Sequence, residues 1–260
     1  SKMNKKIQNL RQKVLDVLNS TKLHDHQREA ARKSFAALKY PVRAVITAAE
    51  MQAGKSGVAL ALCCLQRISL ADEDLCNRSK LKDTLYMVTM PDIALIDQAE
   101  KDLADAKNVV VSNFVRFEQD LERNFKGNPP KLILIDECHY GSNASAVRYC
   151  KVFDYLEKEN KECKVVFISA TPFGALYAAE TEYDAAKHEE QIAIHNKDKN
   201  GAKQAAEIAE EAAKNSILRR DFNTKLVFHR TSNEYYGIRE MLTNNKVISL
   251  DSDSRNFLFE

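Results

Sequence analysis

The sequence predicts an α/β fold in which helices cover both faces of a mostly parallel central sheet. Strand-like and helix-like segments alternate along residues 42–178, and two of the strand-like segments, Leu132–Ile135 and Val165–Ile168, are continuous apolar runs. Such runs are typical of parallel strands that are buried on both faces. With 260 residues, 44% of them hydrophobic and 29% charged, the chain can bury a core of that size.

The elements follow in order from the apolar positions and the helix breakers. Apolar residues at helical spacing predict helices over 3–20 and 25–38, and Pro41 ends the second pattern. Strand patterns then occupy 42–48, 84–90, 109–114, 132–135 and 165–168, and helix patterns occupy 55–68, 92–106, a short segment ending at 125, and 147–159. Strands that alternate with helices in this way predict a parallel sheet with helices on both sides.

The character of the chain changes after residue 178. Residues 180–200 are polar with no strand pattern, and residues 201–213 contain six alanines but few large apolar side chains. A strand–helix–strand pattern follows over 225–229, 234–242 and 246–250. The expected organisation is a basic helical segment (1–40), a core domain (41–178), a linker or connecting helix (179–220) and the incomplete start of a second domain (221–260).

Charge and composition restrict the classes of protein. Residues 1–40 hold ten Lys and Arg against three acidic residues, which fits either a nucleic-acid footprint or a solvated helix face. The apolar run Val58–Leu65 is too short to span a bilayer, so no membrane association is expected. The six cysteines form no CxxC pair and show no zinc-ligand spacing, which favours reduced thiols in a cytoplasmic protein.

The segment Ala49-Glu-Met-Gln-Ala-Gly-Lys-Ser56 joins a predicted strand to a predicted helix. A phosphate-binding loop requires this context, because backbone N–H groups at a helix N-terminus surround the phosphates. Lys55 would reach the β- and γ-phosphates and Ser56 would bind Mg²⁺. Ala49 replaces the first glycine of the full pattern. The candidate nucleotide contacts are Gln52, Ala53, Gly54, Lys55, Ser56 and Gly57.

Two further motifs follow predicted buried strands. Asp136, Glu137, Cys138 and His139 come after the first of these strands, and Ser169-Ala-Thr171-Pro closes the second. Beside a phosphate loop, Asp136 would hold Mg²⁺ and Glu137 would orient and deprotonate the attacking water. Ordinary strand-end turns are the alternative for each motif alone. All three motifs, however, occur in order at the carboxyl ends of predicted strands, where ligands bind in open parallel sheets.

These motifs, AxxxxGKS, DECH and SATP, resemble motifs I, II and III of the superfamily II helicases and translocases, of the DEAD/DEAH-like type. The resemblance covers roughly residues 23–173. It implies a RecA-like P-loop NTPase domain, a three-layer sandwich that uses ATP and Mg²⁺. It also implies that Lys55, Asp136 and Glu137 are catalytic, and that His139, Ser169 and Thr171 couple the state of the γ-phosphate to nucleic-acid contacts.

Two looser matches extend the resemblance. The segment Leu23–Ala30 looks like the upstream glutamine motif of the family, which implies that Gln27 contacts adenine. Tyr86–Met90, followed by Leu95 and Gln98, looks like motif Ia, whose loop touches the nucleic-acid backbone in relatives.

The chain also departs from the family pattern. Lys225–Arg230 resembles the motif IV strand that opens a second RecA-like domain, but no QxxRxxR arginine motif follows before Glu260. An arginine finger contributes about 10³–10⁵ in rate, so this chain is expected to bind ATP and to hydrolyse it slowly. A second RecA-like domain or an effector subunit beyond Glu260 would supply the missing surface.

The predicted function is therefore the ATP-hydrolysing motor domain of a superfamily II DNA helicase or translocase, with DNA favoured over RNA as the partner. Two alternatives remain open. One is a nucleotide-dependent switch or assembly ATPase that recruits a nuclease or another partner. The other is an RNA-directed helicase of the same superfamily.

Overall fold

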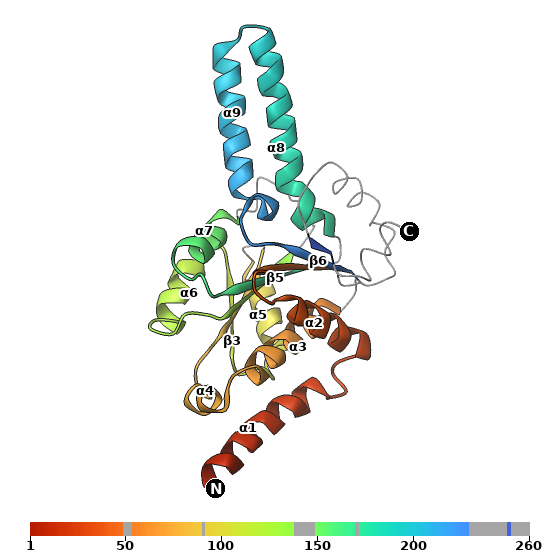
Figure 1. The fold of residues 1–260 in the computed structure, drawn as a ribbon, viewed down its shortest axis with the longest axis vertical. Helices are drawn as coiled ribbons and strands as arrows, with labels where there is room; N and C mark the ends of the chain where they lie inside the picture. Colours follow the sequence, from red (N-terminus) through yellow and green to blue (C-terminus); the bar gives the residue numbers. More distant parts are fainter. Residues whose placement is uncertain (49–53, 90–91, 138–148, 170–171, 229–248, 251–260) are drawn as a thin grey trace.

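The computed structural model describes residues 1–48, 54–89, 92–137, 149–169, 172–228 and 249–250 (Figure 1). Its centre is a seven-stranded sheet in the order β3-β2-β4-β5-β1-β6-β7, and every neighbouring pair is parallel. The strands are β1 (Ala44–Ala48), β2 (Thr84–Val88), β3 (Val109–Asn113), β4 (Leu132–Glu137), β5 (Lys164–Ser169), β6 (Lys225–Phe228) and β7 (Ser249–Leu250). The predicted α/β class with a mostly parallel sheet is confirmed.

Helices form a layer on each face of the sheet. One layer contains α2 (Asp25–Ala37), α3 (Gly54–Ile68) and α5 (Ile93–Asp102), and the other contains α6 (Phe117–Asn124) and α7 (Cys150–Lys158). Successive side chains of a strand pack against opposite helix layers, because they alternate between the two faces of the sheet. In β4, for example, Leu134 packs with the first layer and Ile135 with the second.

The N-terminal helix α1 (Lys2–Leu18), predicted from its apolar spacing, packs below α3 and beside α4 (Asp72–Asn77). Ile7 is buried against Leu75, and Arg11 donates to the main-chain oxygen of Leu70 at 2.8 Å. The sequence pattern did not predict α4, although its first turn is acidic, a charge that the N-terminal dipole of a helix favours.

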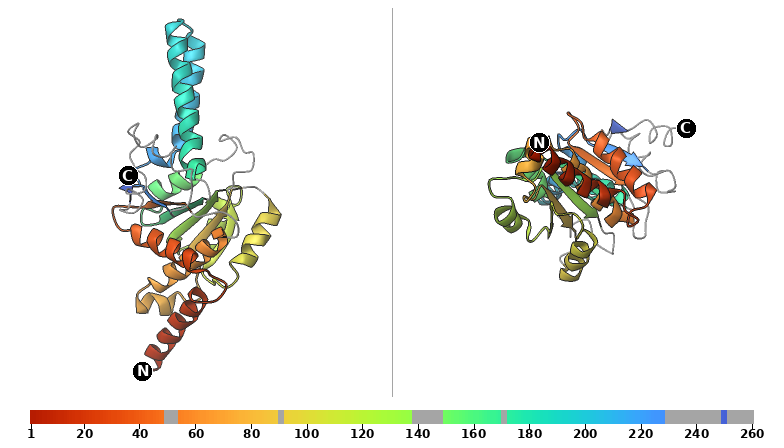
Figure 2. Two further views of the ribbon diagram at one scale, coloured as in Figure 1. Left: turned by 90° about the vertical axis from the view of Figure 1, so that its right-hand side faces the viewer. Right: turned by 90° about the horizontal axis from the view of Figure 1, so that it is seen from below.

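The segment after β5 forms a helical hairpin. Helix α8 (Pro172–His195) and helix α9 (Lys199–Lys214) lie side by side and project from the body at the end opposite α1 (Figures 1 and 2). Residues 201–213, expected to belong to a linker or connecting helix, are helical as part of α9. The polar stretch 180–200 is helical as well, and the 3₁₀ turn η2 (Ile217–Arg219) returns the chain to the sheet.

The described part of the expected second domain belongs to the first sheet. The pattern over 225–229 predicts the opening strand of a new domain, but β6 pairs in parallel with β1, with Val45 opposite Lys225. Leu226 and Val227 are fully buried, because the free edge of β1 offers a place where an apolar strand is covered on both faces. The helix expected over 234–242 lies outside the described residues.

Among the described residues, no helix is both long enough and apolar enough to cross a membrane.

Candidate nucleotide site

The topology brings the ends of three motif-bearing strands to one edge of the sheet. Strands β4, β5 and β1 are neighbours, with Glu137 opposite Ser169 and Ser169 opposite Ala48. The structure describes Glu137 and Ser169 only by these strand positions. Gln52, Ala53, His139 and Thr171 lie outside the described residues. The structure describes the side chains of Lys55 and Ser56 at the start of α3, of Asp136 near the end of β4, and of the elements packed against them.

Lys55 and Asp136, which are far apart in the sequence, are joined by an ion pair. The Lys55 Nζ atom lies 3.3 Å from Asp136 Oδ1, and each side chain is about a quarter exposed (24% and 26%). Lys55 stands in the first turn of α3, and Asp136 is the fifth residue of β4. Asp136 Oδ1 is buried and accepts no hydrogen bond within the part of the chain that the structure describes.

Tyr86 of β2 is a further side chain of this site. Its hydroxyl donates a hydrogen bond to the Asp136 carboxylate from the neighbouring strand, where Val88 is opposite Asp136. Burial is the main cause that raises the pKa of Tyr86 well above 10.0, and the charge of Asp136 and the hydrogen bond to it act in the same direction. The sequence pattern treated Tyr86 as part of a loose motif Ia. The available signal was a hydroxyl inside the apolar run Leu85–Val88 of this strand.

Gln27 lies against the start of α3. Its Oε1 accepts a hydrogen bond from the His24 backbone N at 2.8 Å, which completes a capping box at the start of α2, and the residue is only 3% exposed. A Cβ atom on Gly57 would fall 2.4 Å from the Gln27 Cδ atom. Glycine at position 57 therefore permits this approach. The contact of Gln27 with adenine stays a prediction.

A buried pair of hydroxyls holds α2 on the sheet. Ser34 of α2 and Thr47 of β1 are both fully buried and hydrogen-bonded to each other. Ser34 Oγ donates to the Ala30 main-chain oxygen at 2.8 Å, so the proton between the two hydroxyls belongs to Thr47. This bond fixes α2, and with it Gln27, relative to the strand that leads to the phosphate loop. Neither residue was a candidate from the sequence.

The family model described as "Type III restriction enzyme, res subunit" (ResIII) matches residues 20–174. The chain belongs to this family. The ResIII domain is a superfamily II helicase-like ATPase domain of the DEAD/DEAH type, so the predicted family and the nucleotide-binding class are shown. No curated protein matches the chain.

The ResIII match covers the elements that build the site. It begins before α2 and ends just after α8 starts, so Gln27, Lys55, Tyr86 and Asp136 all fall inside it. Helix α1 and almost the whole hairpin fall outside it.

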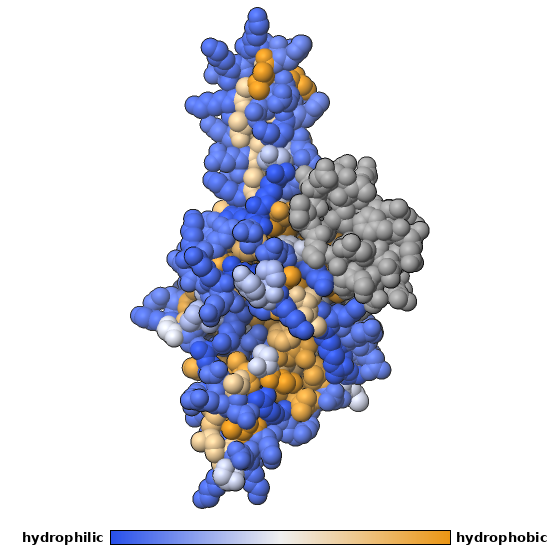
Figure 3. Space-filling model, in the orientation of Figure 1, coloured by the Kyte–Doolittle hydropathy of each residue, from blue (hydrophilic) through white to orange (hydrophobic). Residues whose placement is uncertain are grey.

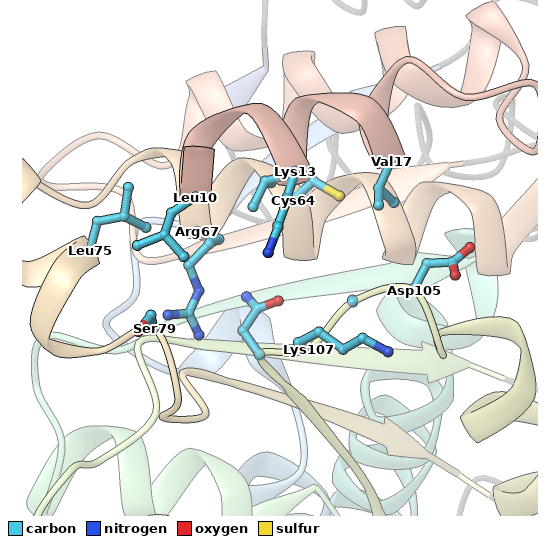
Figure 4. A pocket seen from close by; sticks show the side chains of 12 residues that line it. Leu10, Lys13, Val17, Cys64, Arg67, Leu75, Ser79, Asp105 and Lys107 are labelled. Atoms are coloured by element: carbon cyan, nitrogen blue, oxygen red, sulfur yellow. The ribbon is translucent and has the colours of Figure 1, made fainter. Parts of the chain in front are cut away.

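A cavity of about 410 Å³ between α1 and α3 lies apart from this site (Figure 4). Its lining includes Leu10 and Val14 of α1, Arg67 of α3 and Asn108, which precedes β3. Arg67 donates to the main-chain oxygens of two loop residues at 2.6 Å, and Asn108 Nδ2 donates to Asp83 at 2.7 Å. These polar groups satisfy the protein's own loops at the amino-terminal edge of the sheet, so the cavity adds no residue to the ResIII site.

Proposed function

We propose that this ResIII domain is the ATP-hydrolysing motor of a DNA helicase or translocase. The observation that carries the proposal is the Lys55–Asp136 ion pair at the carboxyl edge of the sheet. A lysine at a helix N-terminus provides positive charge for a polyphosphate. A carboxylate at the end of the facing strand provides an anchor for a divalent cation. The pair therefore joins the two halves of a phosphoryl-transfer site.

The described residues fit a magnesium–nucleotide complex. Asp136 Oδ1 is a buried oxygen that accepts no hydrogen bond from the described residues and lies 3.3 Å from the Lys55 ammonium, and Ser56 stands in the same first turn of α3 as Lys55. Carboxylate and hydroxyl oxygens are the hard ligands that Mg²⁺ takes, so Asp136 and Ser56 would hold the ion. Bound Mg²⁺ would supply charge neutralisation at the β- and γ-phosphates.

Each residue then has a separate part in hydrolysis. Lys55 exchanges its bond to Asp136 for the phosphate oxygens and offsets their charge. Tyr86 holds the Asp136 carboxylate in place through its hydroxyl. We assign activation of the attacking water to Glu137, which follows Asp136 at the end of β4, and nucleic-acid coupling to His139, Ser169 and Thr171.

DNA is the proposed track. The family description names a restriction enzyme subunit, and such enzymes act on DNA. Helix α1 adds exposed basic side chains, including Lys5, Lys6 and Lys13, that could follow a phosphate backbone. Arg11 is not counted among these side chains, because it pairs with Asp72 at 2.8 Å and donates to two main-chain oxygens of the protein itself.

Steady-state ATP hydrolysis with no polymer, single-stranded DNA, duplex DNA or RNA tests the proposal. We expect slow basal turnover, stimulation by DNA, and loss of both in Glu137→Gln. Lys55→Ala should also remove binding of Mg·ATP, measured with a fluorescent ATP analogue. Lys126→Ala is the matched control, because Lys126 is 79% exposed and lies in the connection between α6 and β4, on the amino-terminal side of that strand.

Other outcomes would redirect the assignment. Stimulation by RNA alone would favour an RNA-directed helicase. Turnover that no polymer changes, but that Glu137→Gln still abolishes, would favour a nucleotide-dependent switch that recruits a partner. Turnover that survives both Lys55→Ala and Glu137→Gln would reject the site itself.

A further inference from the structure

A second cavity, of about 440 Å³, lies at the amino-terminal edge of the sheet, opposite the ResIII site. It is bounded by the ends of α2 and α3, the connection that follows α4, and the first residues of β4 and β5. Small-molecule sites have volumes of about 300–1,000 Å³, so the cavity is of suitable size for a ligand. None of the residues assigned to the ResIII site lines it.

The lining of this cavity combines apolar and polar groups. Exposed apolar side chains gather on the body of the molecule in Figure 3, whereas about half of the residues that line the cavity are polar or charged. Phe35, Leu38 and Pro130 belong to the apolar part. An apolar wall with a few polar groups is typical of a site for an organic molecule.

Gln66 provides the first of the polar groups. It stands in the last turn of α3 and is only 8% exposed. Its main-chain oxygen accepts a hydrogen bond from Ser69 Oγ at 2.6 Å, but its side-chain amide has no hydrogen-bond partner among the described residues. A buried amide in this state is costly, because it has lost its hydrogen bonds to water without replacement. A ligand in the cavity would supply the missing partner.

Arg78 is a second donor without a partner. Its Nη1 atom is buried and donates to no described residue, and its guanidinium forms no ion pair with them. Its main-chain oxygen accepts from Arg67 at 2.6 Å, which fixes the backbone at this position. Asp83, a buried carboxylate just before β2, is paired with Arg67 instead, at 3.4 Å. The charge of Arg78 is therefore left for another anion.

Two lysines add further positive charge. The Lys164 N atom donates to the Lys131 main-chain oxygen at 3.1 Å, where β4 and β5 begin side by side. The Lys164 ammonium donates to the Leu38 main-chain oxygen and so meets the negative end of α2. Lys131 forms no ion pair within the part of the chain that the structure describes. The lining holds one carboxylate, that of the exposed Glu162, so positive charge is in excess.

We propose that this cavity binds a small organic anion that carries a phosphate or carboxylate group. Arg78 and Lys131 donate to its oxygens, because guanidinium and ammonium groups have only donors and form strong hydrogen bonds with anions. The Gln66 amide adds a further donor, and Phe35 and Leu38 contact the carbon skeleton. The proposal does not depend on the proposed motor activity.

Isothermal titration calorimetry of the whole chain with phenyl phosphate or benzoate measures the binding, because each probe joins an anionic group to a small ring. Whichever of the two binds more tightly identifies the group that the site prefers. Benzyl alcohol, which has the ring but no charge, should bind far more weakly. The wild type and Lys55→Ala should bind the anions equally, since the phosphate loop takes no part.

Substitutions in the lining test the assigned donors. Arg78→Gln should raise the dissociation constant about tenfold or more, because a charge-assisted hydrogen bond is lost. Lys80→Gln is the matched control, because Lys80 is exposed, lies two residues further along the same connection and does not line the cavity. Urea unfolding checks that each variant keeps its fold.

Gln66→Leu separates binding from stability, because leucine is similar in size to glutamine and has no amide. It should weaken binding of the anion about threefold or more. Without the anion it should not lower the stability of the protein in urea, since no hydrogen bond is lost. A clear loss of stability would show that the amide already has a partner.

Chemical labelling gives the position of the bound anion. Lysines are acetylated with sulfo-NHS acetate and the products are identified by mass spectrometry. Labelling of Lys131 should be slower when the tighter-binding anion is present, and labelling of the exposed Lys126 should not change. An unchanged rate at Lys131 would place the anion elsewhere.

Three results of the titrations would overturn the proposal. One is that neither anion binds at millimolar concentrations. The second is binding that Lys55→Ala abolishes and Arg78→Gln leaves unchanged, which would place the anion in the phosphate loop alone. The third is benzyl alcohol bound as tightly as the anions, which would make the cavity an apolar site.

Discussion

Replacing Gly57 by alanine should damage the contact between the glutamine segment and the phosphate-loop helix. An added Cβ would lie 2.4 Å from the Gln27 Cδ and Nε2 atoms, where ordinary contacts begin at 3.4 Å. The Gln27 amide must then move by about 1 Å or leave its place. Since the side chain is only 3% exposed and caps α2, neither movement is free.

Two opposing effects set the magnitude. Overpacking of this kind costs about 1–3 kcal/mol, and loss of a capping bond costs about 1 kcal/mol. Alanine in place of glycine inside a helix returns about 0.5–1 kcal/mol. Gly57→Ala alone should therefore destabilise the protein by about 1–3 kcal/mol. In the Gln27→Ala background the obstacle is absent, so the same substitution should stabilise it by about 0.5–1 kcal/mol.

Urea unfolding of the wild type, both single variants and the double variant measures this change of sign. The expected coupling is about 1.5–4 kcal/mol, well above the 0.3–0.5 kcal/mol within which independent sites typically add. Equal effects of Gly57→Ala in both backgrounds would refute the close approach. Binding of a fluorescent ATP analogue to the same proteins then shows whether the position of Gln27 also matters for the nucleotide.

Two further predictions concern buried polar groups. Tyr86→Phe should cost about 1.5–3 kcal/mol at neutral pH, because the charged Asp136 loses a hydrogen bond. The folded pKa of Tyr86 is raised above 10.0, so above about pH 10 only the unfolded chain ionises this tyrosine. The stability advantage of the wild type over Tyr86→Phe should therefore fall by up to about 1.4 kcal/mol per pH unit. A difference in unfolding free energy that stays constant in urea between pH 8 and 11 would contradict this. Arg219→Ala should cost about 2–4 kcal/mol, because it removes an ion pair and two hydrogen bonds from the buried Glu180 carboxylate. Replacing the exposed Arg123 by alanine should change the free energy of unfolding by no more than about 0.5 kcal/mol. A similar loss of stability in both variants would show that the contact between Arg219 and Glu180 stabilises the protein no more than a surface side chain does.

The strands and helices of the core were predictable because each has a local signal. Continuous apolar runs mark the buried strands, and the helix that begins at Gly54 follows a recognisable phosphate-loop pattern. The sequence also predicted that Lys55 and Asp136 lie at one edge of the sheet, since parallel strands end at the same edge, but their ion pair is a finding of the structure.

The hairpin of α8 and α9 was less predictable, because each of its helices is stabilised by packing against the other. Residues 180–200 lack an apolar stripe, and the seam they contribute consists of alanines, which bury little surface on any one helix. Only when α9 lies against α8 does either helix gain a covered face. The base of this hairpin likewise depends on the contact between Glu180 and Arg219, which are distant in sequence.

By itself, the sequence determined the alternation of strands and helices, the family and the motif residues at the strand ends, because these depend on local patterns and on spacing along one chain. The tertiary structure alone decided that Tyr86 supports Asp136, that Gly57 makes room for Gln27, and that β6 joins the sheet beside β1. Each of these depends on which elements become neighbours and how closely they approach. That is decided when the buried surfaces of the whole chain pack together, and no local pattern records it.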